Sequence, residues 1–123
     1  MAISEVERKR IRAYWKERRE REEEGARRSR QEAWEKARMV AARLKEEWGA
    51  KQVLLYGSLA REGAFDHLSD IDLFVVGLPT GQDYWRMLAE CRELARPFPV
   101  SIVPEEDAFP SLRQKVLREG KAL

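Results

Sequence analysis

LYGSLAR, at residues 55–61, and SDIDLFVV, at residues 69–76, are the two stretches that decide the fold of this chain. The first is apolar up to Gly57-Ser58, where a strand is expected to end and a short helix to begin. The second is an apolar strand that opens with Asp70 and Asp72. Because residues i and i+2 of a strand point to the same face, the two carboxylates are expected to project together.

This arrangement predicts a site for a metal ion and a phosphate group. Two neighbouring carboxylates repel each other unless a cation lies between them, and Mg²⁺ prefers oxygen ligands of this kind together with substrate phosphates. The free N–H groups at the start of the helix expected at Gly57-Ser58 can bind an anion. A phosphate site and a metal site at adjacent strand ends together predict nucleotidyl transfer from a nucleoside triphosphate.

The two motifs resemble a known family. Gly-Ser followed at short range by Asp-x-Asp is the signature of the DNA polymerase β-like nucleotidyltransferases, and here Ser58 and Asp70 are twelve positions apart. Over residues 33–123, the pattern GSLAR…SDIDL is most similar to the minimal nucleotidyltransferase branch. The resemblance implies a fold of the α/β class, with a small mixed β-sheet flanked by helices.

The resemblance also implies roles for individual residues. Asp70 and Asp72 would be the catalytic carboxylates that bind Mg²⁺ and, through it, the nucleoside triphosphate. Gly57 would let the backbone approach a phosphate, and the Ser58 hydroxyl and N–H would donate hydrogen bonds to it. Arg61 would either contact a phosphate or anchor the loop to the sheet.

One position departs from the family pattern. The family has a third carboxylate on a later strand, which helps to bind the metal and accepts the proton of the attacking hydroxyl, and this chain has Ser101 there, within VSIV at residues 100–103. A serine hydroxyl is a neutral ligand and no general base at neutral pH. Two alternatives stay open. Either Glu105 or Glu106 reaches inward from beyond the strand, or nucleotide binding persists while transfer is slowed or lost.

The rest of the chain predicts the other elements of the sheet and its helices. Apolar residues recur at helical spacing over residues 32–48 and 84–95, and a short helix is expected from residue 112 to Gly120. Residues 52–56 and 100–103 are expected to be strands, an order typical of an α/β unit. The loop between the two motifs carries an acid and the sole histidine, Asp66 and His67, without a pattern that assigns them a role.

Residues 1–32 are predicted to be a charged helical extension, and residues 33–123 the minimal nucleotidyltransferase domain. The extension holds eleven Lys or Arg and eight Asp or Glu residues, and opposite charges four positions apart support a helix that Gly25 weakens. It has no face able to cover a core. It is therefore either a solvated, partly frayed arm, or an arm that packs on a partner or a second subunit of a homo-oligomer through Ile11, Tyr14 and Trp15.

The composition restricts the function classes. Charged residues make up 37% of the chain, yet the net charge is only +2, which argues against a dedicated nucleic-acid-binding protein. Cys91 is the single cysteine, so no internal disulfide forms, as expected in the cytoplasm. The sequence predicts neither a membrane span nor a signal peptide. Seventeen Arg against seven Lys, and the absence of Asn, are compositional signs of a thermophilic source.

The resemblance implies a Mg²⁺-dependent nucleotidyltransferase that moves a nucleoside monophosphate, AMP from ATP, onto a hydroxyl group of a protein partner. Minimal members of the family act with a separate helical HEPN-type protein in toxin–antitoxin pairs, in which the antitoxin AMPylates the toxin. The alternative is an antitoxin-like binding module that holds its partner without catalysis. Ser101 favours this alternative, whereas the two intact motifs favour the enzyme.

Overall fold

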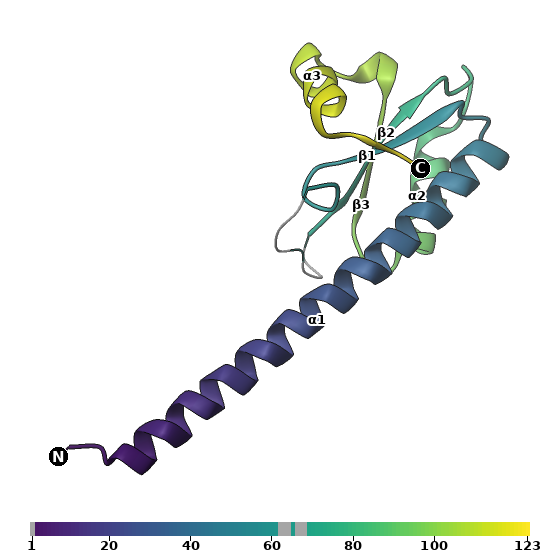
Figure 1. Cartoon of the computed structure of the whole chain (residues 1–123). Coiled ribbons are helices and arrows are strands. Elements are labelled where there is room, and N and C mark those ends of the chain that lie inside the picture. The colour runs from purple at the N-terminus through teal and green to yellow at the C-terminus, as the bar shows by residue number, and fades with distance from the viewer. Residues whose placement is uncertain (1, 62–64, 66–68) are drawn as a thin grey trace.

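A four-stranded mixed β-sheet with helices on both faces forms the folded part of the chain (Figure 1). The computed structural model describes residues 2–61, 65 and 69–123. The elements, in chain order, are α1 (Glu5–Glu46), β1 (Gln52–Tyr56), β2 (Ile71–Val76), α2 (Tyr84–Ala95), β3 (Val100–Pro104), the 3₁₀ turn η1 (Glu105–Asp107), α3 (Pro110–Glu119) and β4 (Lys121–Ala122).

The strands lie in the order β3-β2-β1-β4, with β1 antiparallel to β2 and β4, and β2 parallel to β3. This arrangement confirms the predicted α/β class and the small mixed sheet. The strands expected at residues 52–56 and 100–103 and the helix expected at residues 84–95 are present. β4 was not predicted, because two residues give no periodic pattern.

The two faces of the sheet have different partners. Helices α1 and α2 cover one face, and the main core between them and the sheet includes the buried residues Ala37, Val40, Leu44, Leu55, Leu73, Met87 and Cys91. Cys91 is thus a core residue, as its place in an apolar helical pattern indicates. Helix α3 covers the opposite face, where Tyr56, Phe74 and Val116 are buried together. Because side chains alternate along a strand, Asp72 points to the same face as Phe74, toward α3.

Helix α1 is one continuous helix that extends far beyond the sheet (Figure 1). The extension is helical as predicted, and it continues through Gly25 into the helix that was expected to begin at residue 32. A Ser4 capping box begins the helix, and ion pairs four residues apart join Arg18 to Glu22 and Arg28 to Glu24. Such interactions offset the roughly 1 kcal/mol by which one helical glycine is less favourable than alanine.

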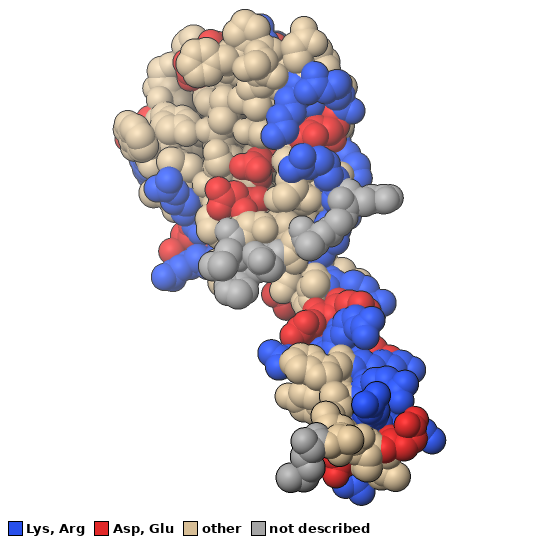
Figure 2. Space-filling view, turned by 90° about the vertical axis from the view of Figure 1, so that its left-hand side faces the viewer, with Lys and Arg blue, Asp and Glu red and all other residues tan. Residues whose placement is uncertain are grey.

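The N-terminal part of α1 makes no contribution to the core. Ala33 is its first buried residue. Acidic and basic side chains interleave along the projecting arm, with an uncharged patch near its end (Figure 2). The exposed large apolar residues of this segment are Ile3, Val6, Ile11, Tyr14 and Trp15. The division of the chain at residue 33 and the binding of a partner or second subunit by the arm stay predictions.

Deletion of residues 1–30 is expected to leave a folded domain, because no residue among the described positions 2–30 is buried. The deletion removes the two hydrogen bonds that Arg30 donates, to the Leu59 carbonyl at 3.0 Å and to the Arg61 carbonyl. Each such bond contributes about 1 kcal/mol, so the melting temperature is expected to fall by less than about 16 °C. Calorimetry measures this shift, and loss of the cooperative transition would show that the arm packs on the domain.

Two expected boundaries differ in the structure. Ser58–Ala60 form a turn and not a short helix, with the N–H groups of Ala60 and Arg61 both donating to the Gly57 carbonyl. Strand β2 begins at Ile71, so Asp70 directly precedes the strand.

In the described parts of the chain, no helix is both long and apolar enough to cross a membrane.

Candidate functional site

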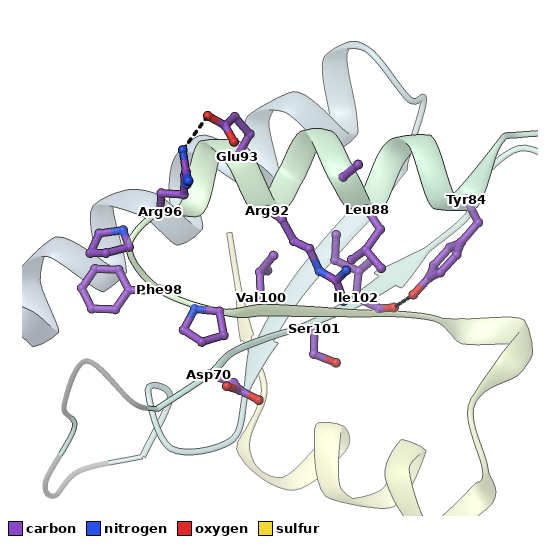
Figure 3. A pocket seen from close by; sticks show the side chains of 13 residues that line it. Asp70, Tyr84, Leu88, Arg92, Glu93, Arg96, Phe98, Val100, Ser101 and Ile102 are labelled. Atoms are coloured by element: carbon purple, nitrogen blue, oxygen red, sulfur yellow. Dashed lines mark hydrogen bonds and ion pairs between the residues drawn. The ribbon is translucent and has the colours of Figure 1, made fainter.

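The start of β2 places the predicted carboxylates in the middle of the sheet. Asp72 lies opposite Tyr56 of β1 on one side and beside Ser101 of β3 on the other. Facing residues of neighbouring strands point to the same face of a sheet, so all three side chains lie on the α3 face. In the close-up, Asp70 and Ser101 also project to the side of β3 opposite α2 (Figure 3).

Ser101 therefore lies next to Asp72, where the resemblance leads us to expect the third carboxylate. The proposal that Glu105 or Glu106 compensates is wrong, because both residues lie in η1, beyond the opposite end of β3. Four residues of strand, about 13 Å, separate Ser101 from Glu105. Asp66 and His67 lie outside the described residues.

Gly57 brings the first motif into contact with the second. A Cβ atom at this position would lie 2.3 Å from the Asp72 Oδ2 atom, and Gly57 has a φ of +78°. A side chain of any size would clash with the carboxylate, and the left-handed backbone conformation independently favours glycine. The half-buried Ser58 follows directly. The structure thus brings Gly57, Ser58 and Asp72 together, as the spacing predicts.

The electrostatics of the site show that the two carboxylates are close. The pKa of Asp72 is raised, first by burial of its carboxyl group and then by the negative charge of Asp70. The positive charges of Lys115 and Arg61 oppose this shift. A cation between the two carboxylates would remove their repulsion.

The residues fit Mg²⁺ as an ion shared with a substrate. Among the described residues, no group of three or more acidic, histidine or cysteine side chains is arranged to hold a metal. Mg²⁺ usually keeps several waters and is bound through one or two carboxylates together with substrate phosphates. Asp70 and Asp72 match this donor set, whereas a site made of protein ligands alone does not.

Helix α3 adds two charged residues to the site that the sequence pattern did not reveal. The Gly57 N–H donates a hydrogen bond of 3.0 Å to the Glu119 Oε1 atom. Arg61 Nε lies 3.9 Å from Glu119 Oε2, and Lys115 Nζ lies 3.9 Å from Glu119 Oε1. The spacing of Lys115 and Glu119, four positions apart on a helix, was the only available signal, and it did not indicate where the pair would lie.

Arg61 anchors its turn through its backbone, to α1 and not to the sheet, and the contact of its side chain with a phosphate stays a prediction. Its backbone carbonyl accepts a hydrogen bond from the Arg30 guanidinium, so this residue helps to anchor the turn to α1. Its own side chain is 55% exposed beside Glu119, which leaves the guanidinium accessible to a ligand.

A groove of about 810 Å³ runs along β3, the strand at the edge of the sheet, and reaches Asp70 and Ser101 (Figure 3). Helix α2 forms its other wall, from which Arg92 and Leu88 point toward the strand. The Tyr84 hydroxyl donates a hydrogen bond of 2.7 Å to the Ile102 carbonyl and so closes one end of the groove. Asp70 lies at the rim of the groove, whereas Asp72, on the α3 face of the sheet, does not line it.

Comparison with known proteins gives matches in family and in fold. The model of the family described as polymerase beta, nucleotidyltransferase, matches residues 39–123. A solved structure described as a candidate minimal nucleotidyltransferase is 34% identical, with a TM-score of 0.57, and the match covers 71% of this chain and 88% of that one. No curated protein matches this chain.

Two complexes share the fold at lower identity. A toxin–antitoxin structure with AMP-PNP contains a chain that is 23% identical, with a TM-score of 0.57 and coverage of 68% of this chain and 69% of that one. The second is a tri-AMPylated HEPN toxin with its MNT antitoxin, from Shewanella oneidensis. Its matching chain is 20% identical, with a TM-score of 0.55 and coverage of 73% and 70%.

Proposed function

The chain belongs to the polymerase beta nucleotidyltransferase family, and we propose that it transfers AMP from ATP to a hydroxyl group of a protein partner. The observation that carries this proposal is the contact between the two motifs, in which the Gly57 backbone lies against the carboxylate of Asp72. This contact would place a bound phosphate group beside a bound metal ion, as nucleotidyl transfer requires.

Asp70 and Asp72 would hold Mg²⁺, which neutralises negative charge on the phosphate groups when it is bound. The Ser58 hydroxyl and N–H donate hydrogen bonds to a phosphate, and Arg61 adds a positive charge. Transfer forms a bond between the acceptor oxygen and the α-phosphorus, and it breaks the bond from that phosphorus to the oxygen that bridges to the β-phosphate. Pyrophosphate leaves with the bonding electrons.

Among the described residues of the site, none stands as a carboxylate base for the proton of the acceptor hydroxyl at the position of Ser101. Ser101 stands beside Asp72 in the register of β2 and β3, and its hydroxyl does not take up a proton at neutral pH. The proton therefore passes to solvent. Absence of a positioned base slows such a step by about 10²- to 10⁴-fold, so we propose a slow enzyme.

The acceptor approaches Asp70 at the edge of the sheet, where the groove along β3 reaches this residue. A protein with a hydroxyl side chain on a protruding segment fits this open approach. The similarity in fold to an MNT antitoxin found in a complex with a HEPN toxin supports a helical HEPN-type protein as the partner. The cytoplasm as the location belongs to the same proposal. The similarity to the toxin–antitoxin chain in a structure with AMP-PNP supports an adenine nucleotide.

A second candidate function is an antitoxin-like binding module without catalysis. The observation that favours it is Ser101, at the place of the third carboxylate. Both candidate functions include binding of the nucleotide at the same site. They differ only in whether AMP is transferred to an acceptor.

Transfer of label from α-³²P-ATP into the proteins of a host-cell lysate, with Mg²⁺, tests the proposal. The unmodified chain is compared with Asp70→Asn and Ser101→Asp. We expect label that depends on Asp70, and a rate about 10²- to 10⁴-fold higher for Ser101→Asp. Label that appears only with Ser101→Asp would contradict catalysis by the natural chain and favour the binding module.

A further inference from the structure

We infer that Lys115, on α3, binds the phosphate chain of the nucleotide. Helix α3 would then line the site together with the two sequence motifs. The inference rests on the proposed function and extends it to a residue outside both sequence motifs.

The position of Lys115 follows from the packing of α3. This helix covers the sheet face that carries Asp72, with Val116 buried against Tyr56 and Phe74. Lys115 precedes Val116, and its Nζ atom lies 6.0 Å from the centre of the Tyr56 ring. Because Tyr56 lies directly opposite Asp72, the ammonium group is held over the part of the sheet where the carboxylates are.

Contacts at the C-terminal end of α3 fix the helix against the first motif. Glu119 accepts the hydrogen bond of the Gly57 N–H. The Glu119 side chain is 20% exposed, so this bond is largely shielded from water. It ties the last turn of α3 to the turn that carries Ser58. Lys115 lies one helical turn earlier and therefore faces the same turn.

The ammonium group keeps hydrogen-bonding capacity for a ligand. Its distance to Glu119 Oε1, 3.9 Å, is longer than the 2.7–3.2 Å of a hydrogen bond. The Lys115 side chain is 39% exposed, so a phosphate can reach it. An ammonium group has three N–H donors, and a lysine in this situation binds a phosphate as a point charge.

The charge balance of the site requires such a residue. Of the described residues at the site, Asp70, Asp72 and Glu119 carry three negative charges and Arg61 and Lys115 two positive ones, so their net charge is −1. A bound Mg²⁺ brings this to +1. The several negative charges of a triphosphate therefore need cationic side chains beside the metal, and the two cations next to Glu119 meet that need.

Binding of Mg²⁺ and α,β-methylene-ATP to the full chain, measured by calorimetry, tests the inference, with AMP as the second probe. Lys115→Met is expected to weaken binding of the triphosphate roughly 10- to 100-fold, because a hydrogen bond to a charged group is lost. AMP lacks the β- and γ-phosphates, so its binding is expected to change less than about threefold. Lys115→Arg is expected to retain most of the affinity.

Lys121→Met is the matched control. It removes the same charge from a nearby residue whose Nζ atom lies 5.7 Å from the Trp34 ring, on the side of α1, and it is expected to leave both affinities unchanged. Triphosphate binding by Lys115→Met at the level of the unmodified chain would overturn the inference and leave the proposed function in place. No binding of the triphosphate by the unmodified chain would overturn both.

Discussion

Replacing Asp72 by asparagine is expected to abolish Mg²⁺-dependent binding of ATP and to leave the fold intact. Asp72 is the half-buried carboxylate against which the Gly57 backbone lies, and the negative charge of Asp70 acts on it directly. Loss of groups that only orient a metal ligand typically lowers metal affinity 10- to 100-fold. Loss of a ligand itself is therefore expected to lower it by more than about 100-fold.

Asp107→Asn is the matched control for this variant, because Asp107 is an exposed carboxylate in η1, away from the site. It is expected to bind ATP as the unmodified chain does. A calorimetric titration in the presence and absence of Mg²⁺ measures both variants. Unchanged affinity of Asp72→Asn would remove the metal-binding role from this residue.

The stability of Asp72→Asn at different pH values separates loss of binding from loss of structure. Because the folded-state pKa of Asp72 is raised, the native state binds more protons than the unfolded state between the ordinary and the raised pKa. The stability that Asp72 contributes therefore falls as the pH rises through this window. Asparagine does not titrate, so the variant is expected to melt at or above the temperature of the unmodified chain at neutral pH. This advantage is expected to disappear in acid, as thermal denaturation at several pH values would show.

Replacing Gly57 by alanine is expected to have the largest effect on stability and to abolish nucleotide binding as well. The new Cβ atom would lie 2.3 Å from Asp72 Oδ2, and the residue has a φ of +78°. The left-handed conformation costs an L-residue about 1–2 kcal/mol, and the clash adds about 1–3 kcal/mol. We therefore expect the free energy of unfolding to fall by about 2–5 kcal/mol, as measured by denaturant titration.

Gly81→Ala separates the two causes. Gly81 has a φ of +82°, but a Cβ atom there meets no atom within 4 Å in the described part of the chain. This variant is expected to lose only the backbone contribution, about 1–2 kcal/mol, and to bind nucleotide normally. Gly57→Ala and Gly81→Ala could instead lose the same free energy of unfolding and both still bind nucleotide. That result would contradict the close contact between Gly57 and Asp72.

The sequence predicts the sheet well because its signals are local. The apolar run that ends at Gly57 and the one that begins after Asp70 each give a strand by their own pattern. The register between β2 and β3 then places Ser101 next to Asp72, where the resemblance expected the third carboxylate. The strands depend on residues within a few positions of each other, whereas the place of Ser101 beside Asp72 was expected from the family signature alone.

Other parts of the site depend on contacts between distant residues. Gly57 and Glu119 are 62 positions apart, and no periodic pattern reports that the end of α3 reaches the first motif. The turn at Ser58 was expected to be a helix, because glycine and serine are common at helix starts as well as in turns. The continuity of α1 through Gly25 was not predicted either. One unfavourable residue is outweighed by the capping box and the ion pairs along the helix.

If the site transfers the nucleotidyl part of ATP, the phosphorus that reaches the acceptor protein is the α-phosphorus. The unmodified chain, with Mg²⁺ and a host-cell lysate, is given either α-³²P-ATP or γ-³²P-ATP, and labelled proteins are separated by electrophoresis. Nucleotidyl transfer predicts a protein labelled from the α-position and unlabelled from the γ-position, with the signal lost in Asp70→Asn. Label from the γ-position, or label from the α-position that persists in Asp70→Asn, would contradict the account.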